Sequence, residues 1–144
     1  MLKRITSVLI GLVVCLAVIF LLEALSAMIY PPPSGTNIKD PESVRFMMGH
    51  MPDAAFLMVL LAYILGCFSG GMVASFISGR KKPTASIIVG CIVFVSGILN
   101  VVSLPGQPVW FIVVSFILYI PFAYIGYLVV RKKAGTVSLQ AAAQ

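Results

Sequence analysis

The chain has few charged side chains for its length. Of its 144 residues, 10% are Asp, Glu, Lys or Arg, whereas soluble domains carry about 25%. Only 4 residues are acidic, and 60% of the chain is hydrophobic. This composition excludes a soluble globular domain and predicts an all-α integral membrane protein, whose main solvent is lipid.

Residue types that carry enzyme chemistry are also sparse. The chain contains 1 histidine, and it lacks the Gly-x-x-x-x-Gly-Lys sequence that cradles phosphate groups in nucleotide-binding proteins. Cys15, Cys67 and Cys91 lie one each in separate apolar runs, away from any disulfide framework or Cys-x-x-Cys metal pair. We therefore expect no enzyme activity and no cofactor.

Four apolar runs are long enough to cross a bilayer, which takes about 20 residues of helix. They cover about residues 5–29, 54–78, 84–103 and 109–130, and proline or glycine residues separate them. The connections after the second and third runs are short, which favours antiparallel neighbours. The sequence therefore predicts a single transmembrane domain over residues 1–133, folded as an antiparallel four-helix bundle.

The basic residues indicate how this bundle is oriented. Eight of the 10 basic residues lie in three clusters, at residues 3–4, 80–82 and 131–133, and four spans place all three clusters on one side. By the positive-inside rule that side is the cytoplasm, so both termini are predicted to be cytoplasmic and residues 30–53 form an outer loop. The net charge of +6 then reflects membrane orientation, and no nucleic-acid partner is expected.

The same bias favours a multi-pass protein of a bacterial inner membrane, although other membranes obey similar rules. The first run is alternatively a signal peptide, because Lys3 and Arg4 precede it and Ala24-Leu25-Ser26 resembles a cleavage site. Its length exceeds the usual apolar region of about 7–15 residues, which favours a retained helix.

Two segments outside the spans have predicted structures. Asp40, Pro41 and Glu42 have the order of a helix start, so we expect a short interfacial helix from Pro41 to about Met48 in the outer loop. Residues 134–144 are small and weakly polar, and we expect them to form a flexible cytoplasmic tail.

Small residues at intervals of four predict a close helix contact. The predicted packing face consists of Gly66, Gly70, Ala74 and Ser78 in the second helix, with Gly90 and Gly97 in the third. We expect this face to seat the second helix on the third within one chain. A contact between two copies of the chain is the alternative.

Glu23 is the acidic residue that stands inside an apolar run. A carboxylate in hydrocarbon costs about 2.5–3.5 kcal/mol, so Glu23 should face the bundle, carry a proton or reach the headgroups. One hypothesis makes it a proton or substrate site together with Asn100, His50 and Tyr119, and Pro121 then kinks the last helix. The structural alternative is that Glu23 bonds Asn100 or pairs with His50 or Arg45.

The outer loop also carries a candidate metal site. Met47, Met48, His50 and Met51 place three thioethers and an imidazole within five residues, and soft ligands of this kind suit Cu(I). The same residues are equally at home in an interfacial helix.

Packing features outnumber chemical ones, so the leading hypothesis is a non-enzymatic bundle that associates with itself or serves as an accessory subunit. Its expected partners are the lipid bilayer and either further copies of the chain or another membrane protein. A proton-linked small-molecule transporter using Glu23 is the first alternative, and copper handling at the outer loop is the weaker one.

Overall fold

A computed structural model describes residues 2–37, 39–79 and 83–142, with side chains described up to residue 132. The described residues form five α-helices and contain no strand. The helices are α1 (Leu2–Ile29), α2 (Pro41–His50), α3 (Asp53–Ile77), α4 (Thr84–Ser103) and α5 (Val109–Ala142).

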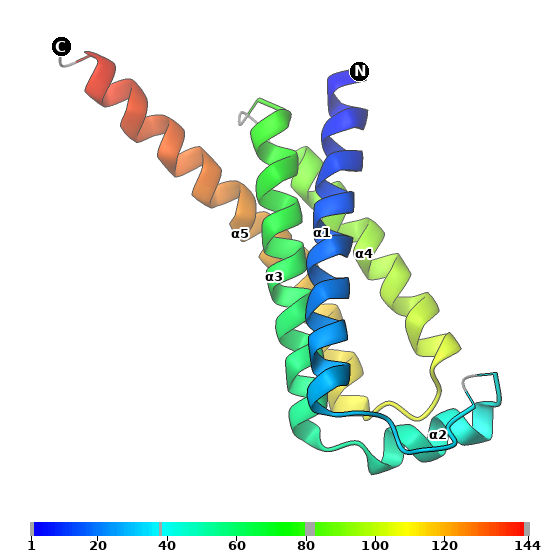
Figure 1. The fold of residues 1–144 in the computed structure, drawn as a ribbon. Coiled ribbons are helices and arrows are strands. Elements are labelled where there is room, and N and C mark those ends of the chain that lie inside the picture. The colour runs from blue at the N-terminus through cyan, green and yellow to red at the C-terminus, as the bar shows by residue number, and fades with distance from the viewer. Residues whose placement is uncertain (1, 38, 80–82, 143–144) are drawn as a thin grey trace.

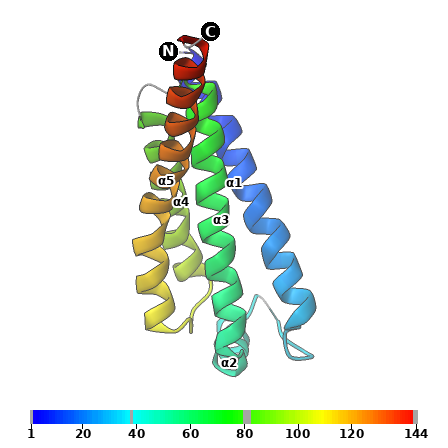
Figure 2. The same ribbon diagram turned by 90° about the vertical axis from the view of Figure 1, so that its left-hand side faces the viewer.

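Four of the helices are long and apolar enough to cross a membrane, namely α1, α3, α4 and the part of α5 from Val109 to Lys132. Figure 1 shows these helices side by side, with the start of α1 and the end of α3 at one end of the molecule. The short helix α2 lies at the opposite end, and the turned view in Figure 2 agrees. The predicted all-helical architecture with four apolar spans is confirmed to this extent.

Helix α2 begins where the sequence predicts it. The Asp40 carboxylate accepts hydrogen bonds from the backbone N–H groups of Glu42 and Ser43, at 3.3 and 3.2 Å. Pro41 occupies the first turn, where a backbone donor is not needed. The helix runs two residues further than expected, to His50.

Helix α5 differs from the prediction at its C-terminal end. It continues through the internal Pro121 and past the third basic cluster to Ala142, where the sequence predicted a flexible tail from residue 134. This segment contains Ala, Leu and Gln, which have good intrinsic helix propensity, beside Gly135, Thr136 and Ser138, which do not. The middle basic cluster, Arg80 to Lys82, lies outside the described residues.

The predicted partner of the glycine face was wrong. A Cβ atom on Gly70 would lie 2.6 Å from Cys15 Cβ, and one on Gly66 would lie 2.5 Å from Ile19 Cγ1, so this face packs against α1. Gly71, on a neighbouring face of α3, meets the backbone of Ala123 in α5. The short α3–α4 connection keeps these helices near each other at one end, but backbone contact is closest where both surfaces are small, as at Gly11 in α1.

The small residues of α4 face α5. A Cβ atom on Gly90 would lie 3.1 Å from Ala123 Cβ, and one on Gly97 would lie 2.8 Å from Cε2 of Tyr119. Ser78, the last member of the predicted face, caps the end of α3. Helix α3 is therefore the central helix, with α1 on one face and α5 on another.

Candidate functional site

A cavity of about 470 Å³ lies at the end of the helices that α2 covers. Every helix contributes to its lining, as does the α4–α5 connection. The lining residues are Glu23, Ser26 and Ala27 of α1; Met47, Met48 and the adjoining Met51; Ala55, Phe56, Val59 and Tyr63 of α3; Asn100; Leu104 and Gln107; and Phe111. Ligand cavities commonly have this size and this mainly apolar lining.

Glu23 is the acidic residue of this cavity, and it is half-buried. Its carboxyl group forms a side-chain hydrogen bond with Tyr63 of α3, which is buried. No basic residue lines the cavity in the described part of the chain. The partner that the structure gives Glu23 is therefore Tyr63, whereas the sequence proposed Asn100, His50 or Arg45.

Tyr63 continues a series of hydrogen bonds away from the cavity. Its side chain also bonds Tyr119 of α5, and the two ring centroids are 5.4 Å apart. Tyr119 bonds Ser115, whose hydroxyl donates to the Phe111 carbonyl at 2.7 Å. Because each hydroxyl can both donate and accept, these side chains connect Glu23 to the interior between α3 and α5.

Asn100 of α4 lines the same cavity as Glu23, but its hydrogen-bond partner is Gln107 in the connection that follows α4. The Gln107 side-chain amide donates to Asn100 Oδ1 at 3.0 Å. Gln107 Oε1 is buried and has no partner in the described part of the chain. The cavity therefore offers an unused acceptor in addition to the Glu23 carboxyl group.

His50 stands apart from the other predicted site residues. It is exposed, its Nδ1 atom is 2.8 Å from the Phe46 carbonyl oxygen, and its ring packs on Phe46 with centroids 4.0 Å apart. It does not line the cavity, so placing His50 with Glu23 was wrong. Met51 follows the last residue of α2 in an extended conformation, so helical spacing alone does not separate the methionines from His50.

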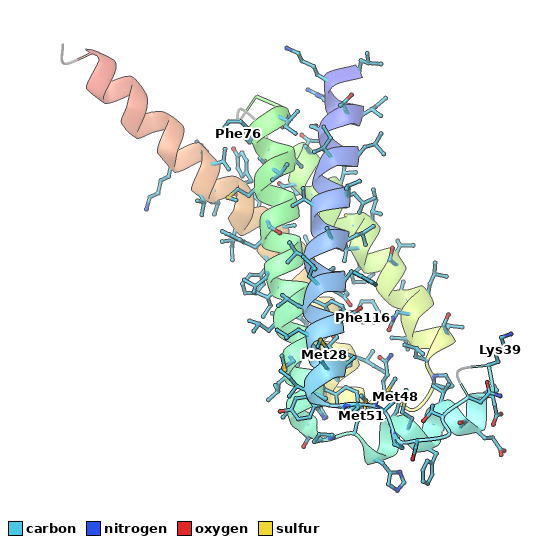
Figure 3. The ribbon with its side chains drawn as sticks, viewed as in Figure 1. Met28, Lys39, Met48, Met51, Phe76 and Phe116 are labelled. Atoms are coloured by element: carbon cyan, nitrogen blue, oxygen red, sulfur yellow. The ribbon has the colours of Figure 1, made fainter. Side chains whose placement is uncertain are left out.

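The three methionines of the candidate copper site do line the cavity. Figure 3 shows Met48 and Met51 beside the end of α1 that carries Met28. Among the described residues, no cluster of three or more His, Cys, Asp or Glu side chains could hold a metal ion. Thioethers are thus the metal-binding atoms that the cavity can offer beside the single carboxylate.

The aromatic rings in the cavity wall indicate which kind of ligand the cavity suits. Phe56 and Phe111 stand with ring centroids 5.2 Å apart, and Tyr63 is 6.2 Å from Phe111. Ring faces, thioethers and one carboxylate suit a ligand with an apolar body and a positive charge. The site can therefore bind a small amphipathic cation, or exchange a proton at Glu23.

Sequence reasoning missed Tyr63 and Gln107. Tyr63 occurs seven residues after Phe56 and seven before Gly70, and this spacing places all three on one face of α3. A tyrosine at such a position inside an apolar run is a signal that could have been used. Gln107 follows Pro105 and Gly106 in a connection, where sequence spacing does not determine the direction of a side chain.

Comparisons with known proteins add no family assignment. No protein-family model, no curated protein and no solved structure matches the chain. The functional argument therefore rests on the cavity and its residues.

Proposed function

We propose that the protein is a small proton-linked membrane transporter whose substrate, an amphipathic organic cation, binds in the cavity beside Glu23. The observation that carries this proposal is the carboxyl group of Glu23, which lines a largely apolar cavity and has a tyrosine hydroxyl as partner. A carboxyl group inside a membrane can hold either a proton or a cation, and exchange between the two couples their movements.

The orientation belongs to the same proposal. With both termini in the cytoplasm, the four helices form an antiparallel bundle, and the cavity opens toward the outer side beneath α2. The basic clusters of the sequence support this arrangement. Helix α2 then lies in the outer interface, with its exposed Phe46 in the lipid edge and its methionines on the cavity.

The rival hypothesis is a bundle that acts by association with itself or with another membrane protein. Its motive was that packing features outnumber chemical ones, and the glycine face among those features has partners inside the chain, in α1 and α5. A transporter needs a cavity in which its substrate binds, whereas a bundle that acts by association does not. We therefore rank the transporter first.

The proposal is tested with proteoliposomes that contain a pH-sensitive dye and receive an outward or inward gradient of benzyltrimethylammonium. This probe combines one aromatic ring with a permanent positive charge. We expect proton movement opposite to the cation in the unaltered protein, and its loss in Glu23→Gln. The matched control is Glu42→Gln, which makes the same change at an exposed acid outside the cavity.

Proton coupling that survives Glu23→Gln would remove Glu23 from the mechanism. Absence of coupling in every variant, together with a fixed stoichiometry to a second membrane protein in native mass spectrometry, would favour the accessory-subunit hypothesis instead.

A further inference from the structure

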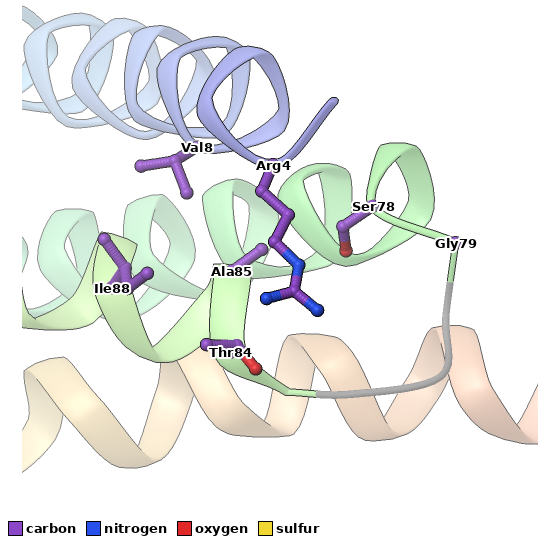
Figure 4. A pocket seen from close by; sticks show the side chains of 7 residues that line it. All are labelled: Arg4, Val8, Ser78, Gly79, Thr84, Ala85 and Ile88. Carbon is purple, nitrogen blue, oxygen red and sulfur yellow. The ribbon is translucent and has the colours of Figure 1, made fainter. Parts of the chain in front are cut away.

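A second pocket lies at the other end of the helices from α2. It has a volume of about 360 Å³ and is lined by Arg4 and Val8 of α1, Ser78 and Gly79 at the end of α3, and Thr84, Ala85 and Ile88 of α4. Figure 4 shows the Arg4 side chain reaching from α1 into the space between Ser78 and Thr84.

The charge in this pocket is positive and has no acidic counterpart. All 4 acidic residues of the sequence, Glu23, Asp40, Glu42 and Asp53, lie elsewhere in the chain. In the described part of the chain, no carboxylate lines the pocket. The Arg4 guanidinium therefore presents donors to a space where hydroxyl groups, and no carboxylates, are its neighbours.

The start of α4 adds to the positive field. Its N-cap residue is Pro83, whose side chain makes no capping hydrogen bond. The first backbone N–H groups of a helix carry partial positive charge, and here no side chain of the cap residue neutralises it. Thr84 in this first turn contributes a hydroxyl group to the pocket.

The rest of the lining is apolar and lies deeper along the helices. Val8 is one turn further along α1 than Arg4, which corresponds to about 6 Å. Ala85 and Ile88 form the facing wall on α4, and Ile88 is 41% exposed. A positively charged opening next to an apolar wall is complementary to a lipid, whose phosphate lies at headgroup depth and whose acyl chain lies deeper in the membrane.

The length of α1 agrees with that depth. Its 28 residues extend about 42 Å at 1.5 Å per residue, which exceeds a hydrocarbon core of about 30 Å. An arginine in the first turn therefore reaches the phosphate level.

From the guanidinium, the hydroxyl groups and the apolar wall together, we infer that this pocket binds the phosphate group of an anionic phospholipid. Arg4 forms charge-assisted hydrogen bonds with the phosphate, for which the planar guanidinium is well suited. Val8 and Ile88 contact an acyl chain. Pockets with basic residues between transmembrane helices are known sites for anionic headgroups.

The test uses the whole protein, purified in a mild detergent without lipid, and titrates phosphatidylglycerol in native mass spectrometry. We expect one lipid to bind more tightly than the others, and Arg4→Gln to weaken that binding at least tenfold. Lys3→Gln is the matched control, because it removes one positive charge from the same turn at a residue that does not line the pocket. Its effect should stay within twofold.

Two further measurements separate the sources of the phosphate. Phosphatidylcholine, which is zwitterionic, should bind at least fivefold more weakly than phosphatidylglycerol. Millimolar inorganic phosphate should leave the bound lipid in place. If inorganic phosphate displaces the lipid, the site binds a free anion and the lipid assignment is overturned.

Equal weakening by Arg4→Gln and Lys3→Gln would mean that general positive charge, and not the pocket, retains the lipid. Correct folding is checked by thermal unfolding in lipid-free detergent, where both variants should match the unaltered protein. Ile88→Ser tests the acyl wall without touching the charge, and unchanged lipid affinity in this variant contradicts the proposed acyl contact.

Discussion

The side-chain amide of Gln107 donates a hydrogen bond to Oδ1 of Asn100 across 3.0 Å, and this bond joins the last turn of α4 to the connection that leads into α5. Both residues line the cavity that contains Glu23. The bond therefore holds the corner of the cavity in place, and it leaves Gln107 Oε1 as a buried acceptor without a partner in the described residues.

We expect Asn100→Leu and Gln107→Leu each to lower the free energy of unfolding by about 1 kcal/mol, because each leaves one half-buried amide unpaired. The double variant should lose less than the sum, with a coupling of about 0.6 kcal/mol, as found for hydrogen bonds between membrane helices. Denaturation in mixed micelles measures all three values. Ser96→Ala is the control, since Ser96 is exposed and its hydroxyl donates within α4, to the Ile92 carbonyl at 3.0 Å. Strictly additive losses in the double variant would show that the two amides act independently.

Tyr63→Phe removes the hydroxyl group between Glu23 and Tyr119 while keeping the ring. We expect a slower rate of proton-coupled cation movement, by roughly tenfold, because a charge-assisted hydrogen bond contributes about 1.5 kcal/mol or more. Dye-monitored flux in proteoliposomes measures the rate. Tyr124→Phe, which changes a tyrosine that does not line the cavity, should transport normally, and equal rates in both variants would exclude the Tyr63 hydroxyl from the transport step.

Gly70→Ala tests the contact between α1 and α3. The new Cβ atom would lie 2.6 Å from Cys15 Cβ and 2.7 Å from the Gly11 carbonyl oxygen, so the helices must move apart. We expect a loss of about 1–3 kcal/mol in the free energy of unfolding. Gly49→Ala is the control, because nothing lies within 4 Å of a Cβ atom at Gly49. A neutral Gly70→Ala would show that α1 does not press on this face.

Copper binding at the Glu23 cavity should depend on the methionines and be independent of His50. We expect replacement of Met47, Met48 and Met51 by leucine to abolish any Cu(I) binding, because thioethers are the soft ligands of the cavity. His50→Ala should leave the affinity unchanged, since that side chain does not line the cavity. Competition with a chromogenic Cu(I) chelator measures both variants, and full affinity in the triple variant would exclude this site.

Orientation is testable with single cysteines in a background that lacks the three native ones. Ser34→Cys, an exposed position before α2, should react with a membrane-impermeant maleimide added to intact cells. Ser138→Cys should react only after the cells are opened, because the positive-inside rule predicts a cytoplasmic C-terminus. The reverse pattern would invert the proposed topology and put the cavity on the cytoplasmic side.

The sequence by itself determined the helical elements and their apolar character. Long, mostly apolar runs form helices in lipid because every backbone group must be paired internally. Pro41 after Asp40 determined where α2 begins. These signals are local, and they placed α4 at the bounds that the structure has, Thr84–Ser103.

Only the tertiary structure decided which helix faces meet. Glycine spacing shows that a face lacks bulky side chains, but it does not identify the helix that packs there. Gly70 meets Cys15 and Gly11 of α1, and the small side chains of that partner allow the contact. The partner of Glu23 was decided in the same way, because Tyr63 reaches it from another helix and no spacing along the chain encodes that distance. Hydrophobic pattern is a property of one helix, whereas a cavity is a property of several helices packed together.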